Sequence, residues 1–255
     1  MLQLIRYILL DIVRTRFILF YTLLLLLSSI GMFQLDGDTS KVLLSLMNIV
    51  LIVVPLVSVV FTTIHFYNSY EFIELMLAQP VDRRLIFLAE FLATVISLVL
   101  AYLIGVGVPM IIYGGAVGGM LLLFTGSMLT VAFVSLAFLS SVLTRDKAKA
   151  IGLALLFWLY FALIYDAFIM WFIYHFSEYP LERATLALVS LNPVDLARIM
   201  MMLELDISAL MGYSGAFFKQ FFGSAQGGIF STLLLILWSL IPIGFATRIF
   251  RRKDL

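Results

Sequence analysis

Several residue types that carry chemistry are scarce or missing in this sequence. Cysteine is absent, which excludes disulfide bonds, thiolate metal sites and cysteine nucleophiles. Charged residues make up only 12% of the chain and the net charge is +1, so a concentrated basic surface for nucleic acid is lacking. No GxxxxGK[ST] phosphate-binding loop occurs. We therefore expect neither nucleic-acid binding nor ATP hydrolysis by the chain itself.

Apolar residues dominate what is present. They make up 64% of the chain and the mean hydropathy is +1.15, whereas a soluble domain is about half apolar. Six apolar runs reach the roughly 20 residues that a membrane-spanning helix needs, and they cover residues 17–33, 42–65, 88–112, 118–143, 150–174 and 229–250. We predict an all-α membrane protein with six transmembrane helices, forming a single transmembrane domain over residues 1–255.

The segment before the first span is amphipathic. Over residues 1–14, apolar positions such as Ile5 and Ile8 alternate with polar ones such as Arg6 and Asp11. This pattern is typical of a helix that lies in the membrane interface without crossing it. We predict an N-terminal interfacial helix.

The segment between the fifth and sixth spans, residues 176–228, is too amphipathic for a free loop. Three parts of it carry helical periodicity, namely residues 181–190, 193–205 and 207–222. Asn192 and Pro193 supply a turn, and Pro193 can open a helix because proline is tolerated at a first helical position. We predict an external cap made of short helices.

The basic residues predict the orientation. Twelve of the sixteen Lys and Arg residues lie near the termini and in the connections after the second and fourth spans. The other four, which lie in the remaining connections, are Lys41, Arg183, Arg198 and Lys219. Because basic residues are enriched in cytoplasmic loops, we expect both termini in the cytoplasm.

The connection between the second and third spans has the most informative pattern. An acidic helix with Glu71 and Leu75 on one side is stopped near Pro80, and Asp82 can cap the helix that follows. Residues 77–84 read Leu-Ala-Gln-Pro-Val-Asp-Arg-Arg. An acidic helix followed by Leu-x-x-Pro-x-x-Arg-Arg resembles the permease subunits of ABC type-2 exporters.

The resemblance implies a permease domain of the bacterial inner membrane, in which residues 67–88 are a cytoplasmic coupling segment. A separate ATPase subunit would dock there and would bind the ATP and magnesium, so no cofactor or enzymatic activity is expected of this chain. Two copies of the permease would enclose a pathway lined chiefly by the first, second and fifth spans. The residues expected at or beside the ATPase contact are Glu71, Glu74, Leu75, Met76, Gln79, Pro80 and Arg83. An ordinary polar loop with topogenic arginines is the alternative interpretation.

A narrower resemblance lies in residues 191–203, Leu-Asn-Pro-Val-Asp-Leu-Ala-Arg-Ile-Met-Met-Met-Leu, and in residues 206–218. These resemble the external region of the permease of the transporter that assists nitrous-oxide reductase maturation. The resemblance implies export of a sulfur-containing species for the copper-sulfur centre, with a periplasmic accessory protein near Asn192, Pro193, Asp195 and Arg198. Export of a lipid or another small hydrophobic compound is an alternative, and so is a non-transporting scaffold that recruits a periplasmic partner.

Two acidic residues fall inside predicted spans. A carboxylate within a membrane is a candidate functional group because its burial is costly, so Asp166, with its neighbour Tyr165, is predicted to line the translocation pathway. Alternatively, water or a tyrosine hydroxyl near the outer end of the span satisfies Asp166. Glu90 lies at the cytoplasmic start of the third span and is expected to be hydrated.

Two further patterns are weaker. Met200, Met201, Met202 and Met211 offer thioethers of the kind that bind Cu(I), but methionine is also a common filler of adaptable apolar surfaces, and we predict no metal site. Residues 212–215, Gly-Tyr-Ser-Gly, match the GxSG of six-span rhomboid proteases. A serine nucleophile needs a base, and no histidine follows His175, so we interpret this motif as a bend.

Overall fold

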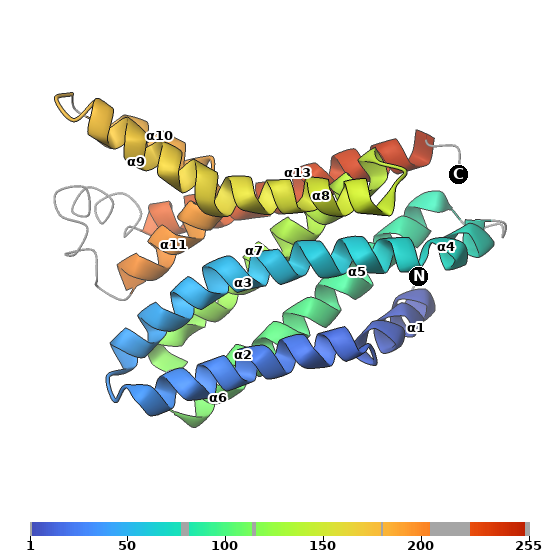
Figure 1. The fold of residues 1–255 in the computed structure, drawn as a ribbon, viewed down its shortest axis with the longest axis horizontal. Helices are drawn as coiled ribbons and strands as arrows, with labels where there is room; N and C mark the ends of the chain where they lie inside the picture. Colours follow the sequence, from blue (N-terminus) through green and yellow to red (C-terminus); the bar gives the residue numbers. More distant parts are fainter. Residues whose placement is uncertain (1, 78–81, 114–115, 180, 205–224, 253–255) are drawn as a thin grey trace.

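The computed structural model describes residues 2–77, 82–113, 116–179, 181–204 and 225–252. Within these residues all regular secondary structure is helical, and six helices are long and apolar enough to cross a membrane (Figure 1). The predicted six-span, all-α fold is confirmed. The first, second and fourth spans are α2 (Arg16–Leu35), α3 (Thr39–Asn68) and α7 (Ala116–Leu143), and the sixth is α13 (Ala225–Arg252).

The third and fifth spans each contain a π-helical turn. The third comprises α5 (Arg83–Tyr102), the π-helix η1 (Leu103–Gly107) and α6 (Val108–Ile112). The fifth comprises α8 (Lys147–Leu159), the π-helix η2 (Tyr160–Ile164) and α9 (Tyr165–His175). A π-turn shifts the backbone hydrogen bonds by one residue, and such turns frequently occur at functional sites.

Aspartate side chains cap three of the spans. Asp38 and Asp82 accept hydrogen bonds of 3.0 Å from the backbone N–H groups of Ser40 and Arg84. Asp146 does the same for the N–H of Lys149 at 3.0 Å. Such a cap contributes roughly 1 kcal/mol by satisfying a backbone donor that the helix leaves free. The predicted cap at Asp82 is therefore confirmed.

The helix α7 forms the centre of the bundle. It is the most buried of the six spans and packs against α3, α13, α8, α5 and α11. Near one end of the bundle, Phe138 of α7 makes edge-to-face contacts with Phe66, Phe87 and Phe91 at centroid distances of 5.3 to 5.5 Å. Phe87 also stacks on Phe250 at 4.6 Å. One aromatic cluster thus joins the second, third, fourth and sixth spans.

The first helix, α1 (Leu2–Val13), lies beside α5 at the same end of the bundle as α4 (Tyr70–Leu77) and the last turns of α13 (Figure 1). It buries Ile8 and Ile12 against the bundle and exposes Arg6 and Tyr7. The helix itself and its two-sided character agree with the sequence. Its position in the membrane interface stays a prediction.

The two described chain ends lie at one end of the bundle, and the connection between α2 and α3 lies at the other (Figure 1). The end with both termini also carries α4 and the start of α8. This is the arrangement that the distribution of Lys and Arg predicts. Assignment of that end to the cytoplasm still rests on the charge bias.

Two short helices follow the fifth span, α10 (Glu182–Ser190) and α11 (Pro193–Glu204). They are bent by 111° at the break between them, and Pro193 opens the second one as predicted. Figure 1 shows α9 and α10 leaving the bundle together, while α11 returns to pack against α7 and α13. The third predicted helix of the cap, residues 207–222, lies outside the described residues, as do Met211 and the 212–215 motif.

The first span approaches the third closely at Gly105. A Cβ atom at this position would lie 2.6 Å from Cβ of Leu25 and 3.1 Å from the carbonyl oxygen of Thr22. Real Cβ atoms essentially never approach another atom as closely as the shorter of these distances. Neither neighbour can move aside easily, because one is a Cβ atom and the other belongs to the backbone. By contrast, a Cβ atom at Gly31, on the same first span, would meet nothing within 4 Å. Helix contacts in membranes use small residues for this reason.

This difference gives a matched pair of substitutions. Gly105→Ala is expected to lower the free energy of unfolding by about 1–3 kcal/mol, the usual cost of overpacking a filled core. Gly31→Ala is expected to leave it unchanged or to raise it by up to ~1 kcal/mol, because glycine is unfavourable within a helix. Denaturation in mixed micelles measures both. Equal midpoints for the two variants would contradict the close approach of the two spans.

Candidate functional site

The helix α4 projects two acidic groups and one large apolar side chain from the end of the bundle. Glu71 and Glu74 are exposed, and Leu75 has 70% of its surface exposed. On the opposite side of the helix, Ile73 is 2% exposed and packs in the core. The predicted two-sided helix is therefore present, with its acidic side free to meet another protein.

Other contacts fix α4 in place. Phe72 stacks on Tyr7 of α1 at 5.8 Å, and Met76 packs against the core cluster. Arg83 is the exposed first residue of α5. Gln79 and Pro80, also predicted at the ATPase contact, lie outside the described residues. The helix is thus held to α1 and the bundle by its apolar side.

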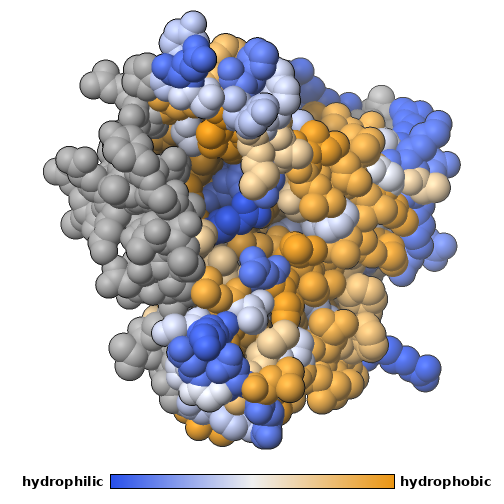
Figure 2. All heavy atoms as spheres, turned by 60° about the vertical axis from the view of Figure 1, so that its left-hand side comes forward, coloured by the Kyte–Doolittle hydropathy of each residue, from blue (hydrophilic) through white to orange (hydrophobic). Residues whose placement is uncertain are grey.

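At the opposite end of the molecule, charged side chains of α9 and α11 meet. Nη1 of Arg198 lies 3.0 Å from Oδ2 of Asp166 and 3.0 Å from Oδ1 of Asp195. Nδ2 of Asn192 donates a hydrogen bond of 2.6 Å to the other carboxylate oxygen of Asp195. We call Asn192, Asp195, Arg198 and Asp166 the outer network. Figure 2, which brings this end forward, shows hydrophilic surface recessed between apolar flanks.

Asn192 ties the outer network to the π-turn of the fifth span. Its Nδ2 also donates to the carbonyl oxygen of Phe161, within η2, at 2.9 Å. Its Oδ1 accepts a hydrogen bond of 3.0 Å from the N–H of Val194. A few residues further on, the hydroxyl of Tyr165 donates to the carbonyl oxygen of Leu188 at 2.7 Å. The fifth span, α10 and α11 are therefore joined through side-chain to backbone hydrogen bonds.

The members of the outer network differ in exposure. The side chains of Asp166 and Arg198 are 38% and 27% exposed, whereas that of Asp195 is 5% exposed. Burial raises the pKa of Asp195 to about 6, an effect that the nearby Arg198 guanidinium partly offsets and that Asp166 reinforces. Asp195 thus changes its charge near pH 6.

Comparison with known proteins identifies the family of the chain. Residues 40–255 match the family described as ABC-2 family transporter protein. The chain belongs to the ABC-2 transporter family. As an ABC-2 permease, it is a multi-pass inner-membrane transport subunit, and the family implies an ATPase partner.

Two curated relatives of this ABC-2 permease have the same name, probable ABC transporter permease protein NosY. The protein from Pseudomonas aeruginosa is 29% identical over 195 residues, which cover 71% of this chain and 68% of that protein. The protein from Stutzerimonas stutzeri is 27% identical over 201 residues, which cover 70% and 67%. Both agree with the narrower resemblance found in the sequence.

The ABC-2 permease brings together residues that the sequence assigned to different roles. Asp166 and Tyr165 were predicted for the pathway, and Asn192, Asp195 and Arg198 for a periplasmic partner. The structure places all of them around η2 and α9 of the fifth span. Asn192 and Asp195 are buried by contacts within the chain, so Arg198 and Asp166 are the members of the network that reach the surface. Contact with a partner stays a prediction.

One expectation about the third span of the ABC-2 permease is wrong. Glu90 is 1% exposed, and its Oε1 lies 3.0 Å from Nε2 of His65. The distance is that of an ion pair, although Oε1 accepts no hydrogen bond of acceptable geometry in the described residues. Sequence position suggested a hydrated site because Glu90 lies only two turns inside α5. The neighbouring helices that pack against α5, including α3 with His65, enclose it.

The methionine side chains of α11 pack in the apolar core. Met200 and Met201 are 8% and 2% exposed, and they pack in two different apolar clusters on either side of the helix. Two successive residues of a helix point in directions about 100° apart, so Met200 and Met201 fill different parts of the core. That the methionines bind no metal stays a prediction.

The raised pKa of Asp195 predicts a pH-dependent stability. An acid with a pKa of about 6 in the folded state, against a usual value of 3.8, binds its proton more tightly when folded. Its contribution therefore favours folding at low pH and is lost as the pH rises through about 4 to 6. In Asp195→Asn this contribution is absent.

Thermal unfolding in detergent tests this sign. The midpoint of the parent minus that of Asp195→Asn should fall between about pH 4 and about pH 6 and stay level above about pH 7. A difference that stays constant over this range would show that Asp195 does not titrate there.

Proposed function

We propose that this ABC-2 permease is the transmembrane half of an exporter in which two copies of the chain work with two copies of a separate ATPase. The observation that carries the proposal is the exposed acidic side of α4, held rigidly at the end of the bundle that carries both termini. The ATPase subunits bind the ATP and magnesium. The permease supplies the pathway.

The setting of α4 suits the transmission of force. The backbone N–H of Ser69, at the junction of α3 and α4, donates to the carbonyl of His65 at 2.9 Å. Ile73 is then embedded in the core that the second and third spans share. A displacement of α4 by a partner therefore moves the ends of α3 and α5 with it, because close-packed interiors transmit strain.

A second copy of the permease fits the surfaces that the spans leave open. The first and fifth spans are the least buried in the single chain. On the fifth span, Tyr160, Phe168, Trp171 and Tyr174 are between 44% and 85% exposed. A pathway between two copies, lined chiefly by the first, second and fifth spans, would use these faces. Tyr165 and Asp166 would lie at its outer end.

The substrate proposal follows from the narrower resemblance. We propose export of a sulfur-containing species for the copper-sulfur centre of nitrous-oxide reductase, supported by two relatives that are both named NosY. A periplasmic accessory protein would receive the species near the outer network. The α4 end is assigned to the cytoplasm by the basic residues, so both termini are cytoplasmic in this proposal.

Two substitutions on the exposed side of α4 test the coupling to an ATPase. Glu71→Lys and Leu75→Asp are both expected to weaken complex formation with the ATPase at least ~10-fold, since loss of one central contact costs about 1.4 kcal/mol or more, and to lower ATP turnover by the complex. Glu178→Lys, an exposed change at the opposite end, serves as the control. Co-purification and ATP hydrolysis are measured. Unchanged complex formation and turnover in both α4 variants would overturn the assignment of this surface.

A genetic experiment tests the substrate separately. In a host whose own permease for nitrous-oxide reductase maturation is deleted, expression of this chain with its ATPase should restore a reductase that contains the copper-sulfur centre. Its visible absorption spectrum reports the centre. A reductase that stays without the centre, although the complex forms and hydrolyses ATP, would refute the sulfur substrate and leave the ABC-2 assignment intact.

A further inference from the structure

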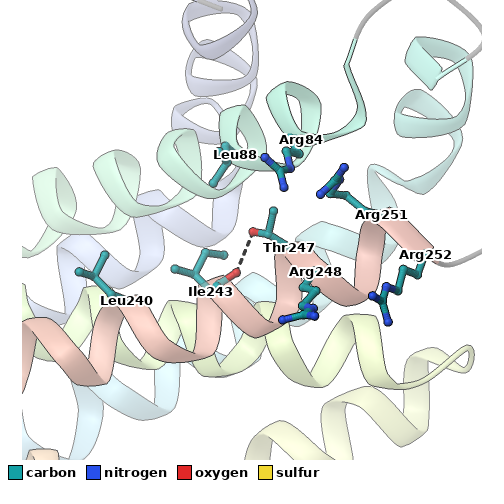
Figure 3. A pocket seen from close by; sticks show the side chains of 9 residues that line it. Arg84, Leu88, Leu240, Ile243, Thr247, Arg248, Arg251 and Arg252 are labelled. Carbon is teal, nitrogen blue, oxygen red and sulfur yellow. Dashed lines mark hydrogen bonds between the residues drawn. The ribbon is translucent and has the colours of Figure 1, made fainter.

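A pocket of about 800 Å³ lies between α5 and α13 at the α4 end of the bundle (Figure 3). Two of its lining residues, Arg84 and Leu88, come from α5. The rest come from α13, and they are Leu240, Ile243, Gly244, Thr247, Arg248, Arg251 and Arg252. The proposed exporter mechanism makes no use of this pocket.

The charged part of the pocket is strongly basic. Its lining includes four arginines and no acidic residue, and Figure 3 shows the side chains of Arg84 and Arg251 extending toward each other across it. Among the residues that the structure describes, no carboxylate lies within ion-pair distance of the four guanidinium groups. An arrangement of planar guanidinium forks matches the geometry of a phosphate group.

The other part of the pocket is apolar. Leu240 and Arg251 are separated by eleven residues of α13, which is roughly 16 Å along a helix axis. Leu88, Leu240 and Ile243 therefore line the wall deeper along the spans, and the arginines lie at their ends. The hydroxyl of Thr247 is occupied, since it donates to the carbonyl of Ile243 at 2.7 Å. The ligand needs a charged head and an apolar continuation.

We propose that this pocket binds an anionic phospholipid. Its phosphate lies between Arg84 and Arg251, with Arg248 and Arg252 on the adjoining surface of α13, and the first part of an acyl chain runs along Leu88, Leu240 and Ile243. Basic pockets between spanning helices at the membrane surface suit such headgroups. The bound lipid joins the end of the sixth span to the start of the third.

The shape of the pocket favours a lipid over a docked protein. A protein that approaches from the aqueous phase meets the ends of the spans, where the arginines lie. It does not reach Leu240, which lies about three turns of helix inside Arg251. An acyl chain runs in that direction. The proposal is independent of the ATPase and of the transported substrate.

Gly244 permits a variant that blocks the apolar part and keeps every charge. A Cβ atom at Gly244 meets nothing within 4 Å, so Gly244→Leu places its side chain in the pocket without a clash. Gly228, near the other end of α13, is also open, and Gly228→Leu is the matched control. For the charge, Arg84→Gln with Arg251→Gln is compared with Arg145→Gln and Lys149→Gln, exposed basic residues at the same end outside the pocket.

The purified full-length permease is incubated with mixed micelles of phosphatidylglycerol and phosphatidylcholine, and retained lipid is measured by native mass spectrometry. The parent should retain phosphatidylglycerol in preference to phosphatidylcholine. Removal of two arginines should weaken retention by about 30-fold, since each basic group contributes about 1 kcal/mol. Gly244→Leu should also lose the lipid, while both controls should bind as the parent does.

Three results would overturn the proposal. If inorganic phosphate displaces phosphatidylglycerol and Gly244→Leu binds as the parent does, the pocket holds a soluble anion and no acyl chain. If the parent retains no more phosphatidylglycerol than the double arginine variant, it is not a lipid site. If that variant keeps its lipid but loses the ATPase in detergent, the arginines form a protein contact.

Discussion

A chain segment within a bilayer must satisfy its backbone hydrogen bonds internally, because the hydrocarbon core offers no water. This constraint accounts for the six long helices. It also explains why so many buried Ser and Thr hydroxyls, including those of Thr63, Thr94 and Ser97, donate to a carbonyl four residues earlier. The π-turns η1 and η2, which interrupt the α-helical hydrogen bonds, are therefore places where other groups can bond to the backbone. In the fifth span, the π-turn η2 is met by Asn192, whose side chain donates to the carbonyl of Phe161.

That hydrogen bond connects the fifth span with the helices α10 and α11. Asn192 lies at the break between α10 and α11, so the π-turn, the break and the paired charges of Asp195 and Arg198 form one connected structure. Through these side-chain hydrogen bonds and the packing of α11 against α7 and α13, the helices α10 and α11 are attached to the spanning bundle.

Composition and hydrophobic periodicity were enough to predict the spans, because the requirement for about 20 apolar residues acts on local sequence alone. The cap at Asp82 and the helix start at Pro193 were predictable for the same local reason. The pairing of His65 with Glu90 and the meeting of Asp166 with Arg198 were not. These contacts depend on which helices pack side by side and at what rotation, and one sequence read along its length does not contain that information. The π-turns likewise left no local signal.

Both described ends of the chain, together with α4, lie at the same end of the bundle (Figure 1). This has a consequence for how such a transporter can be encoded. A peptide linker from the end of α13 to an ATPase docked on α4 would stay on one side of the membrane throughout. The geometry is therefore compatible with a single gene that fuses the permease to its motor, as well as with separate genes for the two subunits.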